Sequence, residues 1–374
     1  MAIAGIKSVD FYLTATGEGV VNHNGAFPVW NPSASEVVKN HMFPKLRGYD
    51  PMQRLSQESA NGEKGSKVMR LDDPALAQAQ LIVSSECVRA EIFREVSFGL
   101  ARVTPDNVAN VLASLHGLVR GYLITVDGGG FPRKSPLYVT DLCCEKPQLA
   151  FNQGTNAKAR VTGDGKDSLY SYFKTGKDLV YEGKASLSIE DLQFIPLENS
   201  LGRSAYDHQV SIGTGRALAQ NITAYLQALA PAGLQPAARF VKKAVRVGAV
   251  HQLGEAGILL NDDALRLLCA EVTELLNTLY IRQGKGYVQM QSVVVDYNDS
   301  GKVFRAAGGN TAVAESQPSQ AFAQYYTEVE LSDEAYEAQL AAQAKALREQ
   351  DKKKAQGKTK GKKEAPAAAD EAQA

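Results

Sequence analysis

Apolar residues along the first hundred positions recur with two different periods. In GIKSVDFYLTAT (5–16) they alternate with polar residues, which predicts a β-strand with one buried face. In LIVSSECVRAEIFREV (81–96) a short apolar run meets a serine pair, and beyond it the apolar residues recur every four positions. This pattern predicts a strand followed by a helix that begins at Ser84 and Ser85, whose hydroxyls can cap the first N–H groups of the helix.

The other patterned segments are a mixture of strands and helices. Apolar runs typical of strands occupy residues 121–126, 137–144, 179–197 and 286–297. Apolar residues recurring every three or four positions predict helices at 104–118, 215–229, 262–280 and 332–349. The basic segment RFVKKAVRV (239–247) fits either a helix or a hairpin. Such a mixture favours an α+β fold, in which a sheet carries long insertions.

Two long stretches have no regular period, and the chain ends in a third segment of simple composition. Residues 17–80 are rich in Gly, Asn, Pro and Ser, and the glycines at 128–130 indicate a turn. Residues 152–180 carry five basic residues among three aromatic ones. Because ordinary loops are much shorter, we expect 17–80 and 152–180 to be functional insertions. The lysine- and alanine-rich segment 351–374 is expected to be disordered and dispensable for folding.

Composition describes a globular chain and restricts its partners. The 374 residues are 44% hydrophobic and 22% charged, with zero net charge. A nucleic-acid site would therefore depend on local clusters of basic residues. No apolar run approaches the roughly 20 residues of a membrane span, and Lys7 and Asp10 interrupt the first apolar run, unlike in a secretory signal. Four cysteines without a CxxC pair suit a reducing compartment, so we expect a cytoplasmic protein that meets no membrane.

The sequence contains none of several common catalytic motifs. It has no GxxxxGK[ST] loop, no HExxH and no GxSxG, so we expect no catalytic residues, no metal and no cofactor. GTGRALAQ (213–220) places two glycines and Arg216 before a predicted helix, but lacks the third glycine of a dinucleotide-binding loop. A nucleotide-dependent enzyme that uses this loop is one alternative function. A structural protein that assembles without RNA is another.

The strand-to-helix segment is more specific. SSECVRAEIFR (84–94) resembles the Ser-Ser-Gln-x-x-Lys/Arg signature of the CRISPR effector backbone subunits, members of the RAMP (repeat-associated mysterious protein) superfamily. Glu86 stands where the family usually has glutamine, and Arg89 where it usually has lysine. The order of predicted elements is also similar to that of the family. LVRGYLI, RKSPLYVTD and YEGKASLSIEDLQFI are most similar to the type IV branch, with type I as the alternative.

The resemblance implies a particular organisation of the chain. The core would be a modified RNA-recognition (ferredoxin-like) palm with large finger and thumb insertions. The implied parts are 1–16 and 81–151 as the first part of the palm, 17–80 as the finger, 152–180 as the thumb, 181–330 as the second part of the palm and the web, 331–350 as a charged helix, and 351–374 as a disordered tail.

The resemblance also implies a function in defence against viruses or plasmids. Such a subunit has no catalytic activity, binds guide RNA (crRNA) and oligomerises into a helical ribonucleoprotein that presents the guide to target DNA. Its implied partners are copies of itself, the small RAMP subunits, the large subunit and a helicase. Ser84, Ser85 and Arg89 would form a phosphate seat at the helix N-terminus. The implied RNA-binding residues are Ser84, Ser85, Arg89 and Arg94 in the signature, Lys67 and Arg70 in the finger, Arg133 and Lys134 after the glycine turn, and Lys158, Arg160, Lys166, Tyr170 and Tyr172 in the thumb.

Overall fold

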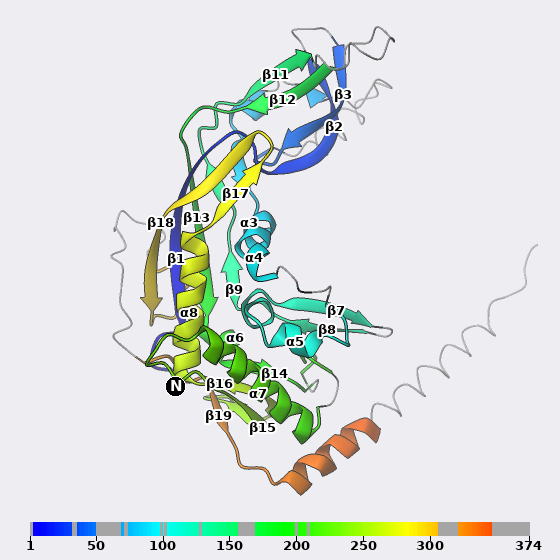
Figure 1. The fold of residues 1–374 in the computed structure, drawn as a ribbon, viewed down its shortest axis with the longest axis vertical. Coiled ribbons are helices and arrows are strands. Elements are labelled where there is room, and N and C mark those ends of the chain that lie inside the picture. The colour runs from blue at the N-terminus through cyan, green and yellow to red at the C-terminus, as the bar shows by residue number, and fades with distance from the viewer. Residues whose placement is uncertain are drawn as a thin grey trace, which may run out of the picture.

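The computed structural model describes most of the chain. The described residues are 3–31, 36–49, 69–70, 74–97, 100, 103–126, 129–155, 169–198, 201–207, 210–305 and 321–345. The candidate residues Lys67, Lys158, Arg160 and Lys166 lie outside these ranges, as does the segment 351–374. The molecule is elongated, with short hairpins at one end and a smaller sheet at the other (Figure 1).

The longest strands form one antiparallel sheet along the length of the molecule (Figure 1). Its centre is β1 (Ser8–Glu18), which confirms the strand predicted at the start of the chain. β1 pairs with β13 (Leu179–Ser188) on one side and with β18 (Gly286–Asn298) on the other. Beyond β18 the sheet continues through β17 (Tyr280–Gln283), and beyond β13 through β10 (Leu142–Cys144), β6 (Gln80–Val83) and β4 (Leu46–Arg47), while β9 (Leu137–Val139) also pairs with β13.

The two faces of this sheet have different surroundings. Val9, Phe11 and Leu13 of β1 are almost fully buried in the main hydrophobic core. On this side α8 (Asp262–Asn277) packs against β18, and α3 (Ser85–Ile92) packs against β9 and β17. Successive strand residues point to opposite faces, so the side chains between them lie on the second face. We call this second face the open face; among its residues are Tyr12, Thr14, Tyr138, Glu182 and Lys184.

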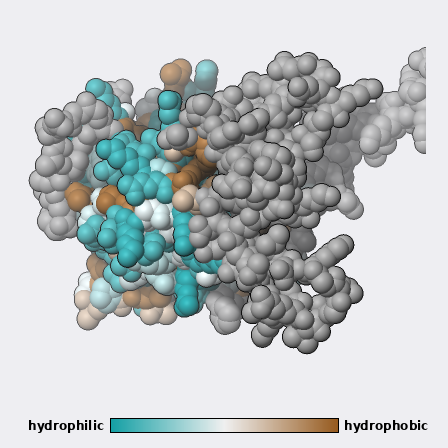
Figure 2. Space-filling view, turned by 90° about the horizontal axis from the view of Figure 1, so that it is seen from above, coloured by the Kyte–Doolittle hydropathy of each residue, from teal (hydrophilic) through white to brown (hydrophobic). Residues whose placement is uncertain are grey.

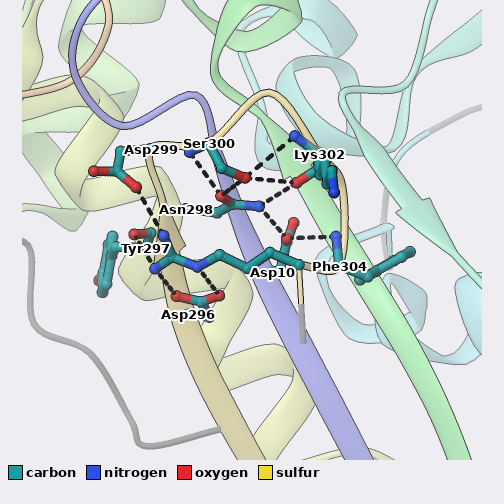
Figure 3. Close-up of polar contacts among 9 residues, drawn as sticks. Asp10, Asp296, Tyr297, Asn298, Asp299, Ser300, Lys302 and Phe304 are labelled. Carbon is teal, nitrogen blue, oxygen red and sulfur yellow. Dashed lines mark hydrogen bonds and ion pairs between the residues drawn. The ribbon is translucent and has the colours of Figure 1, made fainter. Parts of the chain in front are cut away.

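A buried carboxylate holds residues 299–305 on the open face. Asp10 is completely buried. Its carboxylate accepts hydrogen bonds from Ser186 Oγ (2.6 Å), Asn298 Nδ2 (2.8 Å) and the Phe304 N–H (2.8 Å). The last two bonds, visible in Figure 3, join β1 to the end of β18 and to the segment that follows it. The carboxylate thus has three donors within the fold.

Arg305 completes this network. Its guanidinium donates to both oxygens of the buried Asp296, at 2.8 and 2.6 Å, and to Asp299 at 2.7 Å (Figure 3). The network holds Phe304 so that its ring lies edge to face with the ring of Tyr12, with the two ring centroids 6.4 Å apart. Residues 299–305 are therefore a fixed part of the sheet surface.

A smaller sheet lies at the opposite end of the molecule from the hairpins (Figure 1). Its strand order is β14 (Phe194–Pro196), β16 (Gly254–Leu260), β15 (Ala238–Arg246) and β19 (Tyr326–Glu328). The ambiguous segment 239–247 is thus a strand, and α7 (Ile212–Leu229) packs against it. A Cβ atom on Gly215 would lie 2.3 Å from the Phe240 ring, so a glycine permits this close packing.

Shorter elements complete the described chain. The remaining strands are β2 (His23–Asn31), β3 (Glu36–Pro44) and β5 (Met69–Arg70) in one sheet, the pair β7 (Tyr122–Val126) and β8 (Gly129–Arg133), and the pair β11 (Ala150–Thr155) and β12 (Leu169–Lys174). The remaining helical elements are α2 (Pro74–Ala77), α4 (Arg94–Ser97), α5 (Val108–Leu112), the π-helical η1 (His116–Arg120) and α6 (Ile189–Gln193), together with residues 333–345.

The mixed α+β character is confirmed, and several local predictions were wrong. The single helix predicted at 104–118 is two short elements, α5 and η1. The strand predicted at 137–144 is two strands, because Thr140 interrupts the ladder: its Oγ1 accepts the Lys184 N–H at 2.8 Å. The strand predicted at 179–197 is interrupted by α6, whose N-terminus Ser188 caps. The glycines assigned to a turn at 128–130 include the first two residues of β8.

Candidate nucleic-acid interface

The serine pair begins α3 as predicted. Ser84 is the N-cap, and its Oγ accepts the Cys87 N–H at 3.4 Å. The Ser85 N–H donates to Asp141 Oδ1 at 2.8 Å. Arg47 donates to the other oxygen of the same carboxylate, also at 2.8 Å. A carboxylate of the chain itself therefore occupies the place where we expected a phosphate to meet the Ser85 N–H.

Glu86 adds a second negative charge at this helix start. Its side chain is 79% exposed and lies 3.6 Å from Lys45 Nζ. The pKa of Glu86 is lowered, because its carboxylate accepts hydrogen bonds from its own N–H and from the Ser84 side chain. The start of α3 thus carries two carboxylates, those of Asp141 and Glu86, and both would repel a phosphate placed there.

Two arginines form a cationic pair beside α3. Arg89 donates from Nη2 to the Leu137 carbonyl at 3.2 Å, and Arg120 donates from Nη1 to His116 Nε2 at 3.1 Å. Burial lowers the pKa of Arg120, and the charge of Arg89 lowers it further. Within the described residues, neither guanidinium forms an ion pair with a carboxylate. Two guanidinium groups that repel each other and have no carboxylate partner among the described residues would be stabilised by a bound phosphate, whose negative charge would offset this repulsion.

Sequence reasoning found Arg89 and missed Arg120. Arg120 follows four consecutive buried residues, His116 to Val119. The segment that contains it, LVRGYLI (118–124), contributed only to the family resemblance. The signal in that segment was the single arginine in an apolar surrounding, a position that a protein rarely gives to a charge without a partner.

The contact between His116 and Ser97 is structural. Ser97 Oγ lies 2.5 Å from His116 Nδ1. An arginine can only donate, so His116 Nε2 accepts the hydrogen bond from Arg120 and the proton of the neutral imidazole is on Nδ1. Nδ1 therefore donates to Ser97 Oγ and cannot act as a base that activates this hydroxyl.

His116 gives the fold a pH dependence. Burial, with a contribution from the Arg120 charge, lowers the pKa of His116 to about 4, below the value near 6.5 of an unfolded chain. The stabilisation by neutral His116 is complete above pH 6.5 and is lost as the pH falls from 6.5 to about 4. We expect the melting temperature to fall more steeply over this window in the wild type than in His116→Gln, which retains an acceptor for Arg120. Parallel curves for the two proteins would contradict this assignment.

Three other candidate residues already have partners in the fold. Arg133 is only 5% exposed and donates to the carbonyls of Leu118 (3.2 Å) and Asp191 (3.0 Å). Burial lowers its pKa to about 10. A phosphate could reach this guanidinium only if the surrounding packing opened. The other two are on the surface: Lys134 pairs with the Asp191 carboxylate at 2.9 Å, and Arg94 pairs with Glu91 at 2.7 Å.

The remaining candidates are placed only by their backbone. Arg70 ends β5, which pairs with β2. Tyr170 and Tyr172 belong to β12, opposite Gly154 and Asn152 of β11. These residues thus belong to strand pairs, whereas Arg89 and Arg120 belong to α3 and η1.

The glycine-rich segment of the alternative enzyme hypothesis lies within a regular helix. GTGRALAQ (213–220) forms the first turns of α7, and Ser211 Oγ caps it through the Thr214 N–H at 3.1 Å. Arg216 lies 3.7 Å from Asp333. Gly215 is needed for packing against β15, so this glycine has an explanation that involves no nucleotide.

The described residues contain neither a metal site nor a membrane-spanning helix. No group of three or more His, Cys, Asp or Glu side chains could hold a metal ion. None of the described helices is both long and apolar enough to cross a membrane.

The large antiparallel sheet carries α3 on one face, and neither Arg89 of α3 nor Arg120 of η1 pairs with a carboxylate among the described residues. Comparison with known families identifies the kind of protein more closely. The chain belongs to the family described as type I-Fv CRISPR-associated protein Cas7fv-like, whose model matches residues 5–329. The predicted relationship to CRISPR effector subunits is thereby confirmed. The type IV branch is not confirmed, and the type I alternative is favoured.

Comparisons with individual proteins add little to the family match. No curated protein matches the chain. A chain of a "CRISPR RNA-guided surveillance complex" is 13% identical, with a TM-score of 0.26, and the match covers 90% of this chain and 99% of that one. A chain of such a complex described as "pre-nicking" is 10% identical, with a TM-score of 0.26 and coverage of 72% and 87%. Csc2 of Thermofilum pendens is 9% identical, with a TM-score of 0.22 and coverage of 80% and 73%.

Proposed function

We propose that this protein is a guide-RNA-binding backbone subunit of a CRISPR ribonucleoprotein, and that it oligomerises along the guide and presents it to target DNA. The observation that carries the proposal is the Arg89–Arg120 pair: two cations without a carboxylate partner in the described residues, beside the signature helix of a chain in this family. A guide held through its phosphates leaves its bases free to pair with a target, and base pairing then provides the sequence recognition.

The proposal includes the organisation implied by the resemblance. The large sheet with α3 and α8 on one face would be the RNA-recognition-like palm, and 181–330 would supply its second part and the web. The insertions at 17–80 and 152–180 would be the finger and the thumb. The paired arms β11 and β12 support a hairpin-shaped thumb. The proposed subunit is cytoplasmic and has no catalytic activity of its own.

The proposed partners are those of a backbone subunit. They are guide RNA, target DNA paired to the guide, further copies of this chain, the small RAMP subunits, the large subunit and a helicase. Lys67, Arg70, Lys158, Arg160, Lys166, Tyr170 and Tyr172 are retained as proposed contacts of the finger and thumb, whereas the structure gives Arg133, Lys134 and Arg94 internal partners.

Purification from cells that express a guide tests the proposal. The protein is expected to carry RNA of guide length and to form helical particles in electron micrographs, and RNase should disperse them. Particles that survive RNase would instead indicate RNA-independent assembly. Purified protein without any bound RNA would contradict the proposal, and stabilisation by a mononucleotide in a thermal-shift assay would favour the enzyme alternative.

The proposed thumb gives a second expected result. Residues 152–180 are expected to be cleaved by a protease in the free protein and protected in the RNA-bound assembly, because guide RNA and a neighbouring subunit would contact them. Limited proteolysis followed by mass spectrometry would locate the cleavage sites. Equal cleavage in both states would mean that this insertion contacts neither RNA nor a neighbour.

A further inference from the structure

A groove with both basic and aromatic side chains lies at the end of the large sheet. It has a volume of about 740 Å³ and runs between the hairpin of β17 and β18 and the segment that follows β12. The hairpin points toward the upper end of the molecule in Figure 1, and Figure 2 shows that end with hydrophilic residues interspersed with apolar ones. The side chains that matter below are Lys174, Lys177, Tyr280, Arg282, Lys285 and Tyr287.

The two tyrosines form an exposed aromatic surface. Tyr280 is 44% exposed and Tyr287 is 38% exposed, and their ring centroids are 6.5 Å apart with an interplanar angle of 36°. The residues next to them, Ile281 and Val288, are buried in the core. Since strand side chains alternate, Tyr280 and Tyr287 lie on the open face, away from α3. Large aromatic rings held at a water-exposed surface favour a ligand with flat rings of its own.

The charge of the groove favours a polyanion. Four cationic side chains and one carboxylate, that of Glu18, line it. Lys177 and Arg282 have no ion pair with any other described residue. Proteins that bind single-stranded nucleic acid combine unpaired cations with exposed aromatic rings. The cations bind the phosphates, and the bases stack on the rings. A duplex would hide its base faces from the tyrosines.

The walls of the groove are fixed to each other. The Gly19 N–H, at the end of β1, donates to Thr175 Oγ1 at 2.8 Å, and Thr175 Oγ1 donates to the Gly176 carbonyl, also at 2.8 Å. Phe173 is buried against Phe43 in an edge-to-face contact at 5.1 Å. The groove is therefore preformed, which reduces the entropic cost of binding.

We propose that this groove binds the DNA strand that the guide displaces from its target, with bases stacked on Tyr280 and Tyr287 and phosphates on Lys177 and Arg282. This inference rests on the proposed guide-binding function. The guide contact at Arg89 is on α3, which packs on the opposite face of the sheet from the two tyrosines. When guide and target pair, the displaced strand is the one whose bases remain unpaired.

Oligonucleotide binding tests the groove without requiring a guide. We expect a fluorescent 20-mer of dT to bind the wild-type protein, and Tyr280→Ala/Tyr287→Ala to weaken this binding at least tenfold. Lys177→Gln/Arg282→Gln should lower the slope of log affinity against log salt by about 1.4. The matched control is Tyr138→Ala, an exposed tyrosine on the same face outside the groove, which should bind like the wild type. Unchanged affinity in both double variants would overturn the proposal.

A second measurement identifies the strand. In the guide-loaded assembly with its target duplex, 2-aminopurine in the displaced strand should be quenched in the wild type and bright in Tyr280→Ala/Tyr287→Ala. The amount of guide RNA in the purified variant should equal that in the wild type. Loss of guide from the variant would overturn the assignment to DNA, because the groove would then hold the guide. Absence of guide from the wild-type protein would contradict the proposed function. Binding of oligo(dT) would then still show whether the groove binds single-stranded DNA.

Discussion

Replacing Arg89 and Arg120 together by glutamine is expected to weaken guide-RNA binding by roughly 100-fold. Each charged hydrogen bond to a phosphate is worth about 1.5–3 kcal/mol, and both guanidinium groups lack a carboxylate partner in the described chain. The slope of log affinity against log salt should fall by about 1.4, since each contact with a single strand contributes about 0.7. Arg89→Ala alone should produce about half of the change in slope.

The matched control for this experiment is Arg216→Gln. Arg216 is an exposed arginine on α7 that pairs with Asp333, whereas Arg89 and Arg120 are half-buried and have no such partner among the described residues. We expect its replacement to leave guide binding and the salt slope unchanged. Glutamine at position 89 can still donate to the Leu137 carbonyl, so the double variant should keep its fold, which a thermal melt would verify. An unchanged salt slope in the double variant would show that the arginine pair does not contact phosphate.

Replacing Asp10 by alanine is expected to lower the free energy of unfolding by about 3 kcal/mol or more. The change leaves three donors, on Ser186, Asn298 and Phe304, without their acceptor inside the protein. Each unsatisfied buried group costs about 1–3 kcal/mol. Urea denaturation would measure the difference, and the loss should be accompanied by protease cleavage near residues 299–305, which this carboxylate holds in place.

Two further variants test whether burial of the Asp10 carboxylate is what stabilises this region. Asp10→Asn retains the shape and one carbonyl oxygen, so it should cost less than Asp10→Ala. Asp299→Ala removes a carboxylate from the same network, but its side chain is 42% exposed and its partner Arg305 keeps both bonds to Asp296. We expect it to cost less than about 1 kcal/mol. Equal costs for Asp10→Ala and Asp299→Ala would mean that burial of the Asp10 carboxylate is not what stabilises this region.

Local patterns were sufficient for the elements next to the site. The change of period in 81–96 predicted both β6 and α3, and the cap by Ser84 followed from the residue type. Such signals depend on residues a few positions apart, so they survive in a single sequence. The same holds for the central strand and for the helices α7 and α8.

The groups that surround the serine pair and the candidate arginines are set by contacts between residues far apart in the sequence. Asp141 meets the Ser85 N–H across 56 positions of sequence and Arg47 across 94. Nothing in the serine motif indicated that a carboxylate would occupy the helix start. The burial of Arg133 has the same origin, because its carbonyl partners come from η1 and α6. Charge and spacing predicted which residues could bind phosphate, but the packing of other segments decides which of them can be reached.

The pairing of β1 has a consequence for synthesis of the protein on the ribosome. Ser8 pairs with Asn298, and Asp10 faces Asp296 across the two strands. At about 5–20 residues per second, β18 emerges roughly 15 to 60 s after β1. During that interval one edge of β1 has no partner, and exposed strand edges can pair with other chains. Nascent chains of this protein are therefore expected to depend on chaperones until residue 298 has left the ribosome.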